Sequence, residues 1–291
     1  MHAYLFPGQG TQFPGMGKEL YENSKLAQEY FKRANAILGY SVTDVMFEGS
    51  AADLKQTKYA QPAIFLHSFI LAQTLGKAFK PDMVAGHSLG EISALAAIGS
   101  LDFESGLKLI SKRASFMQEV CEVENTGMAV VVGLYDVIVR NICNQIDGVV
   151  VPANYNALYQ VVISGEKKAL QEACEKLRPG AKRVVNLPVS GAFHSPFMEP
   201  ITEAFKSVVL ETEFKKPKCP IYQNVTARPS SDIGLIKNNL IDQLTHPVMW
   251  RHTILHMIED GATEFTEIGP GNFLRGLVRQ INKNMVINGI S

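Results

Sequence analysis

A serine flanked by glycines, between a predicted strand and a predicted helix, constrains the fold of this chain more than any other feature. The segment Gly86-His87-Ser88-Leu89-Gly90 fits the pattern G-x-S-x-G. It follows a strand-like run at 82–86 and precedes a helical stretch rich in small residues at 89–99. A chain that passes directly from strand to helix must turn tightly, and glycine on both sides removes side chains that would clash there. The segment therefore predicts helices packed on a sheet, with Ser88 exposed at the end of one strand.

Two interpretations of this turn are open from the pentapeptide itself. Ser88 could be an ordinary capping residue in a glycine-rich turn. It could instead be a nucleophile, with the N–H of Leu89 pointing toward a developing oxyanion and the helix N-terminus adding partial positive charge. The strand–turn–helix context favours the nucleophile.

Short apolar runs alternate with helical patterns over the N-terminal part of the chain. This alternation predicts a mostly parallel sheet. The predicted elements are a strand at 2–6, a helix at 62–79, a strand at 82–86, and helices at 89–99 and 105–121.

The middle of the chain has a different order of elements, β-α-β-β-α-β, which is typical of a ferredoxin-like subdomain. The predicted elements are 128–134, 135–146, 148–152, 160–164, 167–177 and 182–187. Beyond them the pattern returns to helices at 197–210, 232–243, 248–260 and 272–283, with a strand at 264–268. The expected architecture is an α/β core interrupted by a small inserted domain.

The composition favours a globular protein and disfavours several other classes. The 291 residues contain 28 Lys and Arg against 28 Asp and Glu, so neither a dedicated nucleic-acid binder nor a polybasic membrane protein is expected. The N-terminus lacks the features of a signal peptide, and no apolar run approaches the ~20 residues of a membrane span. The four cysteines form no C-x-x-C pair, which favours free thiols. We therefore expect a soluble, cytoplasmic protein.

If Ser88 is a nucleophile, a base must accept its proton, and His194 is the strongest candidate. It lies in a loop just past a predicted strand, where catalytic groups collect, although an ordinary loop histidine would fit there too. His252 and His256 share a helical face, but the segment HTILH lacks the glutamate of a zinc-binding H-E-x-x-H, so no metal is expected. No aspartate between Ser88 and His194 ends a predicted core strand. A backbone or amide carbonyl could therefore orient the imidazole.

Arg113 is the other unusual residue. On the predicted helix 105–121 it flanks the apolar face that contains Ile110 and Met117. It could extend its guanidinium into water along that face. It could instead reach into a pocket and hold a carboxylate through two parallel hydrogen bonds.

Six motifs in order along the chain resemble those of malonyl-CoA:acyl carrier protein transacylases and the related acyltransferase domains of polyketide synthases. They are FPGQGTQ at 6–12, GHSLGE at 86–91, SKRASFMQ at 111–118, GAFHSPFM at 191–198, QLTHPVMW at 243–250 and EIGPGNFL at 267–274. The match runs essentially end to end. The resemblance implies an α/β hydrolase-like core with a mostly parallel sheet, made of 1–124 and 189–291, interrupted by a ferredoxin-like subdomain at 125–188.

The same resemblance assigns catalytic roles. Ser88 is similar to the nucleophile that takes the acyl group, and His194 to its base. Gln9 and Leu89 match positions whose backbone N–H groups form the oxyanion hole. Gln243 matches the residue whose backbone carbonyl orients the histidine, which would explain the missing aspartate.

The resemblance also implies a substrate pocket. Arg113 is similar to the arginine that grips the malonyl carboxylate, and Met117 and Gln61 would line the same pocket. Phe193 matches a position next to the histidine where an aromatic ring accompanies malonyl selection in polyketide acyltransferases and serine accompanies methylmalonyl. The ring would occupy the space of a 2-methyl branch, a difference of about 1–3 kcal/mol.

The implied reaction is transfer of a malonyl group from malonyl-CoA to the phosphopantetheine thiol of acyl carrier protein through a malonyl-serine, for fatty acid synthesis. The expected partners are these two substrates. No resident cofactor, metal, nucleic acid or membrane is expected, and the chain is expected to be a monomer. The alternatives are an acyl hydrolase or thioesterase, a polyketide-pathway acyltransferase, and a non-catalytic docking module. Hydrolytic relatives tend to lack the arginine, so Arg113 favours transfer.

Both implied partners are anionic, and two short stretches of the chain are basic and free of acidic residues. One contains Arg178, Lys182 and Arg183, and the other Arg275, Arg279 and Lys283. Either could be an ordinary solvated surface. We predict that at least one lies near the mouth of the Ser88 pocket and attracts the carrier protein.

Overall fold

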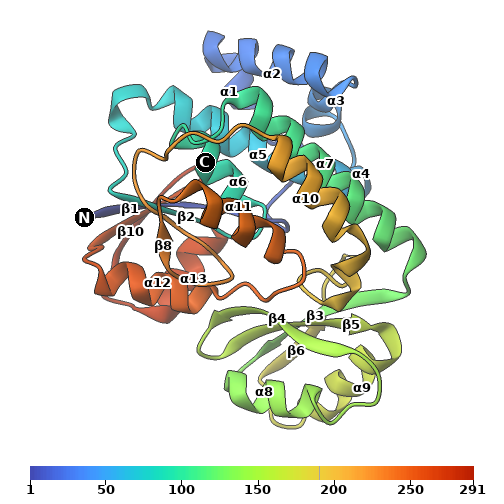
Figure 1. The fold of residues 1–291 in the computed structure, drawn as a ribbon. Coiled ribbons are helices and arrows are strands. Elements are labelled where there is room, and N and C mark those ends of the chain that lie inside the picture. The colour runs from blue at the N-terminus through green and yellow to red at the C-terminus, as the bar shows by residue number, and fades with distance from the viewer. Residues whose placement is uncertain (190) are drawn as a thin grey trace.

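A six-stranded sheet forms the centre of the larger part of the molecule. The computed structural model, which describes residues 1–189 and 191–291, orders its strands β10-β9-β1-β2-β7-β8, with helices on both faces (Figure 1). All neighbouring strands are parallel except β7 and β8, which confirms the mostly parallel sheet predicted from the strand–helix alternation. The strands are β1 His2–Phe6, β2 Met83–Gly86, β7 Ile221–Tyr222, β8 Pro229–Ser230, β9 Glu264–Ile268 and β10 Val286–Ile290.

Alternate residues of the central strand β1 enter two separate apolar layers. Tyr4 and Phe6 belong to the larger cluster, which includes buried residues of helices on one face of the sheet. Ala3 and Leu5 belong to a second cluster on the opposite face. Because successive strand residues point to opposite sides, a strand covered on both faces is apolar throughout. The covering helices are α5 Thr57–Thr74, α6 Gly90–Ala97, α7 Phe103–Val123 and α11 Ile233–Asp242 on one face, and α12 Trp250–Glu259 and α13 Phe273–Ile281 on the other.

The segment 18–55, for which the sequence analysis predicts no element, forms four short helices. The longest of them begins after Ser24, whose hydroxyl accepts a hydrogen bond from the N–H of Ala27 (3.2 Å), and ends at Gly39 with φ 74°. Its residue Phe31 is fully buried. The four helices are α1 Lys18–Asn23, α2 Lys25–Leu38, α3 Val42–Phe47 and α4 Ala51–Lys55.

Two predicted helices differ most from the structure. The one predicted at 62–79 is α5, which ends at Thr74 and is followed by a 3₁₀ turn, Gly76–Ala78. Helix α5 begins at Thr57, five residues before the predicted start, because Gln118 Oε1 on α7 accepts the N–H of Thr57 (3.0 Å). Pro62 therefore lies inside the helix and does not mark its first turn. The predicted helix at 197–210 is a 3₁₀ segment, Pro196–Ile201, followed by α10 Thr202–Glu211. Pro200 within the 3₁₀ segment has no N–H to donate into an α-helical turn.

A second, antiparallel sheet has the strand order β4-β5-β3-β6 and carries α8 and α9 on one face (Figure 1). Its elements follow one another as β-α-β-β-α-β, the predicted order. The helices and strands share their own apolar cluster. The division of the chain into domains stays a prediction. The elements are β3 Thr126–Val132, α8 Asp136–Cys143, β4 Val150–Ala157, β5 Gln160–Glu166, α9 Lys167–Leu177 and β6 Arg183–Asn186.

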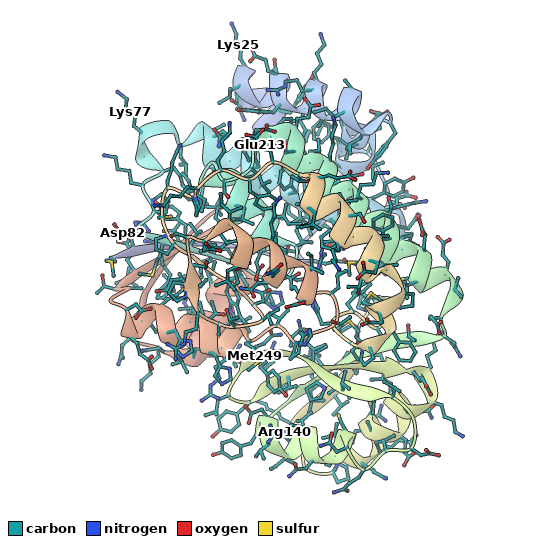
Figure 2. All side chains as sticks on the ribbon, in the orientation of Figure 1. Lys25, Lys77, Asp82, Arg140, Glu213 and Met249 are labelled. Atoms are coloured by element: carbon teal, nitrogen blue, oxygen red, sulfur yellow. The ribbon has the colours of Figure 1, made fainter. Side chains whose placement is uncertain are left out.

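Backbone hydrogen bonds join this smaller sheet to the core beside α12. The N–H of Tyr155 donates to the carbonyl of Val248 (2.9 Å), and the N–H of Val248 donates to the carbonyl of Ala153 (2.8 Å). The next residue, Met249, lies between the larger part of the molecule and the smaller sheet in Figure 2. The strand β4 is thus held against the core close to the predicted nucleophile.

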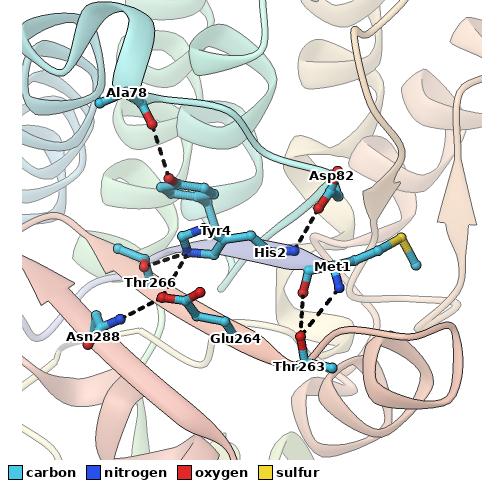
Figure 3. A network of polar contacts seen from close by, with 9 residues as sticks. All are labelled: Met1, His2, Tyr4, Ala78, Asp82, Thr263, Glu264, Thr266 and Asn288. Atoms are coloured by element: carbon cyan, nitrogen blue, oxygen red, sulfur yellow. Dashed lines mark hydrogen bonds and ion pairs between the residues drawn. The ribbon is translucent and has the colours of Figure 1, made fainter.

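Polar contacts fix the start of β1 between its neighbours in the sheet (Figure 3). The N–H of His2 donates to Asp82 Oδ2 (2.7 Å), and its ring lies 2.7 Å from Thr266 Oγ1. The Tyr4 hydroxyl donates to the carbonyl of Ala78 (3.4 Å). Among the described residues, no helix is both long enough and apolar enough to cross a membrane.

Candidate active site

Ser88 occupies a strained turn between β2 and α6. Its φ is +54°, a left-handed conformation that costs a residue with a side chain about 1–3 kcal/mol. The flanking glycines are required by close approach: a Cβ at Gly86 would collide with the backbone of Gly90, and a Cβ at Gly90 would collide with the carbonyl of Phe6. Ser88 is half-buried at the carboxyl end of β2. The turn therefore has the geometry that the glycine spacing predicts.

His194 lies beside Ser88, as the sequence analysis expects of a base. Its Nε2 is 2.8 Å from Ser88 Oγ, and its Nδ1 is 2.8 Å from the carbonyl oxygen of Gln243. A proton on Nδ1 satisfies that carbonyl and leaves Nε2 free to accept the serine proton. His194 is only 4% exposed, and burial, followed by the charge of Arg113, lowers its pKa to about 3. The imidazole is therefore neutral near pH 7.

Arg113 is buried beside the serine, so the interpretation that its guanidinium reaches water is wrong. It is 2% exposed, and burial lowers its pKa to about 10, which leaves it charged near pH 7. Nη1 donates to Gln61 Oε1 (2.7 Å), and Nη2 donates to Gln243 Oε1 (2.9 Å) and to Ser88 Oγ (3.2 Å). Within residues 1–189 and 191–291, no carboxylate lies within 4.0 Å of it. A buried cation held by neutral amides can accept a substrate carboxylate next to the nucleophile.

The other predicted pocket residues are also buried. Gln61 Nε2 donates to the sulfur of Met117 (3.3 Å), so Gln61 contacts both Met117 and Arg113. Phe193 is buried directly before His194 in the chain. A Cβ at Gly191 would lie 2.8 Å from the Phe193 ring, which shows that glycine makes room for it.

The predicted oxyanion-hole residues lie at the ends of neighbouring strands. β1 and β2 are parallel with Phe6 opposite Gly86, so the loop that contains Gln9 and the Ser88 turn leave the same edge of the sheet. Among the described residues, no acceptor is found for the backbone N–H of Gln9 or of Leu89. Free backbone donors at this edge are what a developing oxyanion requires.

Two residues of this cluster, Asn224 and Glu91, were not found by sequence reasoning. Asn224 Oδ1 accepts the N–H of Ser88 (2.7 Å), and its Nδ2 donates to the carbonyl of Gly86 (2.6 Å). Glu91 is fully buried on the first turn of α6 and accepts the N–H of Asn224. The signal for Glu91 was an acidic residue at the start of an otherwise apolar helix. No comparable signal pointed to Asn224.

Two other histidines make contacts of their own. The ring of His87 is buried and lies 2.9 Å from Asn156 Oδ1 on β4. His256 Nδ1 lies 2.7 Å from the carbonyl of Ala227, and His252 lies one turn away on α12. In the part of the chain that the structure describes, no group of three His, Cys, Asp or Glu side chains could hold a metal ion.

A cavity of about 780 Å³ opens beside the Ser88 turn, between the core and the smaller sheet. Gln9, His87 and Phe273 line it from the core, and Lys182 and Arg183 line it from the smaller sheet. The prediction that a basic stretch lies near the Ser88 pocket therefore holds for Lys182 and Arg183. The other basic stretch does not line this cavity. There, Arg275 pairs with Glu267 (3.5 Å).

The chain is similar to known proteins along almost its whole length. The acyl transferase domain family matches residues 3–286. The chain is 39% identical to the malonyl CoA-acyl carrier protein transacylase of Bacillus subtilis, over 99% of this chain and 93% of that protein. Its fold matches the malonyl CoA-acyl carrier protein transacylase of Coxiella burnetii with a TM-score of 0.95, at 34% identity, over 99% of this chain and 93% of that one.

A second solved structure shows a malonyl-transacylase in complex with a type II polyketide acyl carrier protein. It matches with a TM-score of 0.94 at 32% identity, covering 99% of this chain and 94% of that one. The family match spans nearly the whole chain. This chain therefore belongs to the acyl transferase domain family, the family of the malonyl CoA-acyl carrier protein transacylases.

Proposed function

We propose that this protein transfers the malonyl group from malonyl-CoA to the phosphopantetheine thiol of acyl carrier protein. The observation that carries the proposal is the position of Arg113, whose Nη2 lies 3.2 Å from the hydroxyl of Ser88. A carboxylate bound there places the far end of a malonyl group a short distance from the nucleophile. Acetyl groups have no charge to offer this guanidinium.

In the first step, Ser88 Oγ attacks the malonyl thioester while His194 Nε2 takes its proton. The carbonyl oxygen becomes an oxyanion against the N–H groups of Leu89 and Gln9, each worth about 3 kcal/mol of the barrier. The Gln243 carbonyl holds the imidazole in the tautomer that accepts at Nε2. The C–S bond then breaks, CoA leaves as its thiol with the proton from His194, and malonyl-serine remains.

In the second step, the thiol of the carrier protein attacks the malonyl-serine ester. His194 takes the thiol proton and returns it to Ser88 as the C–O bond breaks. The two half-reactions share one site, so ping-pong kinetics are expected. Met117, Gln61 and Phe193 shape the pocket around the malonyl group in both steps.

The main rival is a hydrolase that releases free malonate. Arg113 favours transfer, because a fixed carboxylate holds the ester in one orientation and occupies space next to it. A polyketide role is the second candidate, favoured by the likeness to a polyketide malonyl-transacylase. Assays with carrier proteins of both pathways distinguish it from fatty acid synthesis.

Several finer features belong to the same proposal. The chemistry above uses no resident cofactor, since malonyl-CoA brings the activated thioester and the carrier protein brings the acceptor thiol. We propose that the protein is a monomer. We also propose a cytoplasmic location, which the four free cysteines support. We also propose that 1–124 and 189–291 form a hydrolase-like core and 125–188 a ferredoxin-like insert. The strand order of the smaller sheet supports the second assignment.

Intact-mass analysis tests the proposal directly. Malonyl-CoA should add one malonyl group to the wild-type protein and none to Ser88→Ala, and His194→Ala should slow transfer by about 10²–10⁴-fold. A mixture of malonyl-, methylmalonyl- and acetyl-CoA with carrier protein should give mostly malonyl-carrier protein. Free malonate as the main product would favour the hydrolase, and an unlabelled wild-type protein would contradict the proposed reaction.

A further inference from the structure

The amide side chain of Asn224 binds the nucleophile turn at two points of its backbone. Asn224 Oδ1 accepts the N–H of Ser88 (2.7 Å), and Asn224 Nδ2 donates to the carbonyl of Gly86 (2.6 Å). A single side chain therefore bridges the residue before the turn and the nucleophile itself. Asn224 is fully buried, so water does not replace either bond.

Asn224 is in turn held through its own backbone. Its N–H donates to Glu91 Oε1, and its carbonyl accepts the N–H of Met249 (3.0 Å). Glu91 is fully buried, and within the described residues its other oxygen, Oε2, has no hydrogen-bond partner. Burying a carboxyl group without full hydrogen bonding costs folding free energy. A functional role would explain why Glu91 occupies this position under the Ser88 turn.

The same group of side chains reaches the histidine and the arginine. Gln243 Nε2 donates to the carbonyl of Ser88 (3.1 Å) and to Asn224 Oδ1 (3.4 Å), while Gln243 also binds His194 and Arg113. The backbone of Ser88 is thus bound at both its N–H and its carbonyl. A left-handed residue that carries a side chain persists only where its surroundings fix it in this way.

We propose that Asn224 and Glu91 are positioning residues for acyl transfer. Asn224 holds the Ser88 turn in its left-handed conformation, and Glu91 holds Asn224. This inference rests on the proposed malonyl transfer. Without the pair, the turn relaxes, Ser88 Oγ moves from His194 Nε2, and the N–H of Leu89 no longer faces the oxyanion. Misplacement by about 1 Å at such a site can cost about 100-fold in rate.

Four variants test the proposal. Asn224→Ala removes both turn contacts, and Glu91→Ala removes the support of Asn224. Glu91→Gln is the conservative variant, because its amide oxygen can still accept the N–H of Asn224. Glu267→Ala is the matched control: Glu267 is almost as buried as Glu91, and its carboxylate accepts the N–H groups of Leu274 and Arg275 (both 3.0 Å). Among the described residues, no hydrogen bond joins it to Ser88, His194 or Asn224.

The measurements are kcat and KM for malonyl-CoA, together with the unfolding temperature of each variant. Assays are run well below all of these temperatures. We expect Asn224→Ala and Glu91→Ala to lower kcat by about 10–100-fold with little change in KM, and Glu91→Gln to recover most of the loss. Glu267→Ala should lose stability but keep kcat within about twofold.

Ser88 labelling separates the two proposals. A wild-type protein that malonyl-CoA does not label would overturn the proposed function itself. A labelled wild type together with normal kcat in folded Asn224→Ala and Glu91→Ala would overturn the positioning role. An equal loss of kcat in Glu267→Ala at a matched unfolding temperature would also overturn it, because the effect would then be general destabilisation.

Discussion

The imidazole of His194 is oriented by a peptide carbonyl: its Nδ1 lies 2.8 Å from the backbone oxygen of Gln243. A carbonyl fixes the tautomer as a carboxylate would, but it carries no full negative charge to stabilise an imidazolium. The nearby positive charge of Arg113 further disfavours protonation of His194. The base is therefore kept neutral until it takes the serine proton, and the group that orients it cannot be removed by a side-chain substitution.

The first prediction concerns the selectivity of Arg113. In Gln61→Glu, a carboxylate replaces the amide oxygen that accepts Arg113 Nη1 at 2.7 Å. It should compete with the substrate carboxylate and raise KM for malonyl-CoA by about 10–100-fold, the value of one charged hydrogen bond. Steady-state transfer from malonyl- and acetyl-CoA measures this, with Gln61→Met as a neutral control. Equal losses with both substrates would show that Arg113 does not bind the malonyl carboxylate.

The second prediction is the pH dependence of catalysis. Burial lowers the pKa of His194 to about 3, so the free enzyme holds its base in the active, neutral form throughout the weakly acidic range. kcat/KM should show no inflection from an ordinary histidine between about pH 5 and 7. Burial raises the pKa of Glu91 to about 7, so this residue titrates close to the same range. Repeating the profile in Glu91→Gln removes its contribution. An inflection near pH 6.5 that survives in this variant would contradict the buried neutral base.

The third prediction concerns acid stability. Burial lowers the pKa of His67 to about 4, of His87 to about 4 and of His194 to about 3. Below pH 6.5 the unfolded chain binds protons that the folded chain does not, so these groups make stability fall as pH drops from about 6.5 toward 4. Each contributes roughly 1.4 kcal/mol per pH unit in that window. Between pH 4.5 and about 7, Glu91 has the opposite effect. Its folded-state pKa is raised, so it makes the free energy of unfolding fall as pH rises.

His67 allows this to be measured without touching the site. It is buried in α5, and its Nδ1 has no hydrogen-bond partner among the described residues. In His67→Leu, the free energy of unfolding measured with urea should rise less steeply with pH than in the wild type between about pH 4.5 and 6. The slope should be smaller by about 1.4 kcal/mol per pH unit, which corresponds to one proton. An unchanged slope would mean that His67 is protonated in the folded protein.

The fourth prediction concerns the carrier protein. Lys182 and Arg183 line the cavity beside Ser88, so reversing both charges should weaken docking of an acidic partner. Lys182→Glu with Arg183→Glu should raise KM for carrier protein by about tenfold at low salt, with less effect at high salt. The matched control reverses Arg279 and Lys283, which are exposed but do not line the cavity. Similar effects of the two double variants would reject a local docking role.

The fifth prediction concerns the acyl branch. Phe193 is buried next to His194, and Phe193→Ser opens space where a 2-methyl group would lie. The ratio of methylmalonyl to malonyl transfer should rise by about 10–100-fold, as one methyl group allows. Loss of the ring also costs core packing of about 3–5 kcal/mol, so stability is measured in parallel. Phe197→Ser, four residues along, should leave the ratio unchanged.

Much of the fold followed from local patterns. The apolar runs of β1 and β2 and the helices beside them predicted a mostly parallel sheet, and the β-α-β-β-α-β order of the smaller sheet was predicted correctly. The helices between 18 and 55, the edge strand β10 and the short strands β7 and β8 were missed. Two-residue strands carry almost no periodicity, and their pairing partner lies far away in sequence.

The sequence by itself determined the Ser88 turn, because the requirement for glycine at 86 and 90 arises from steric contacts of the local backbone. Tertiary structure decided what surrounds that turn. Asn224 lies 136 residues from Ser88 and Gln243 lies 155 residues from it, yet both bind its backbone. Parallel strands bring their carboxyl ends to one edge of the sheet, so residues that are remote in sequence meet there. Whether Arg113 faced water or the nucleophile depended on that packing, which no helical periodicity encodes.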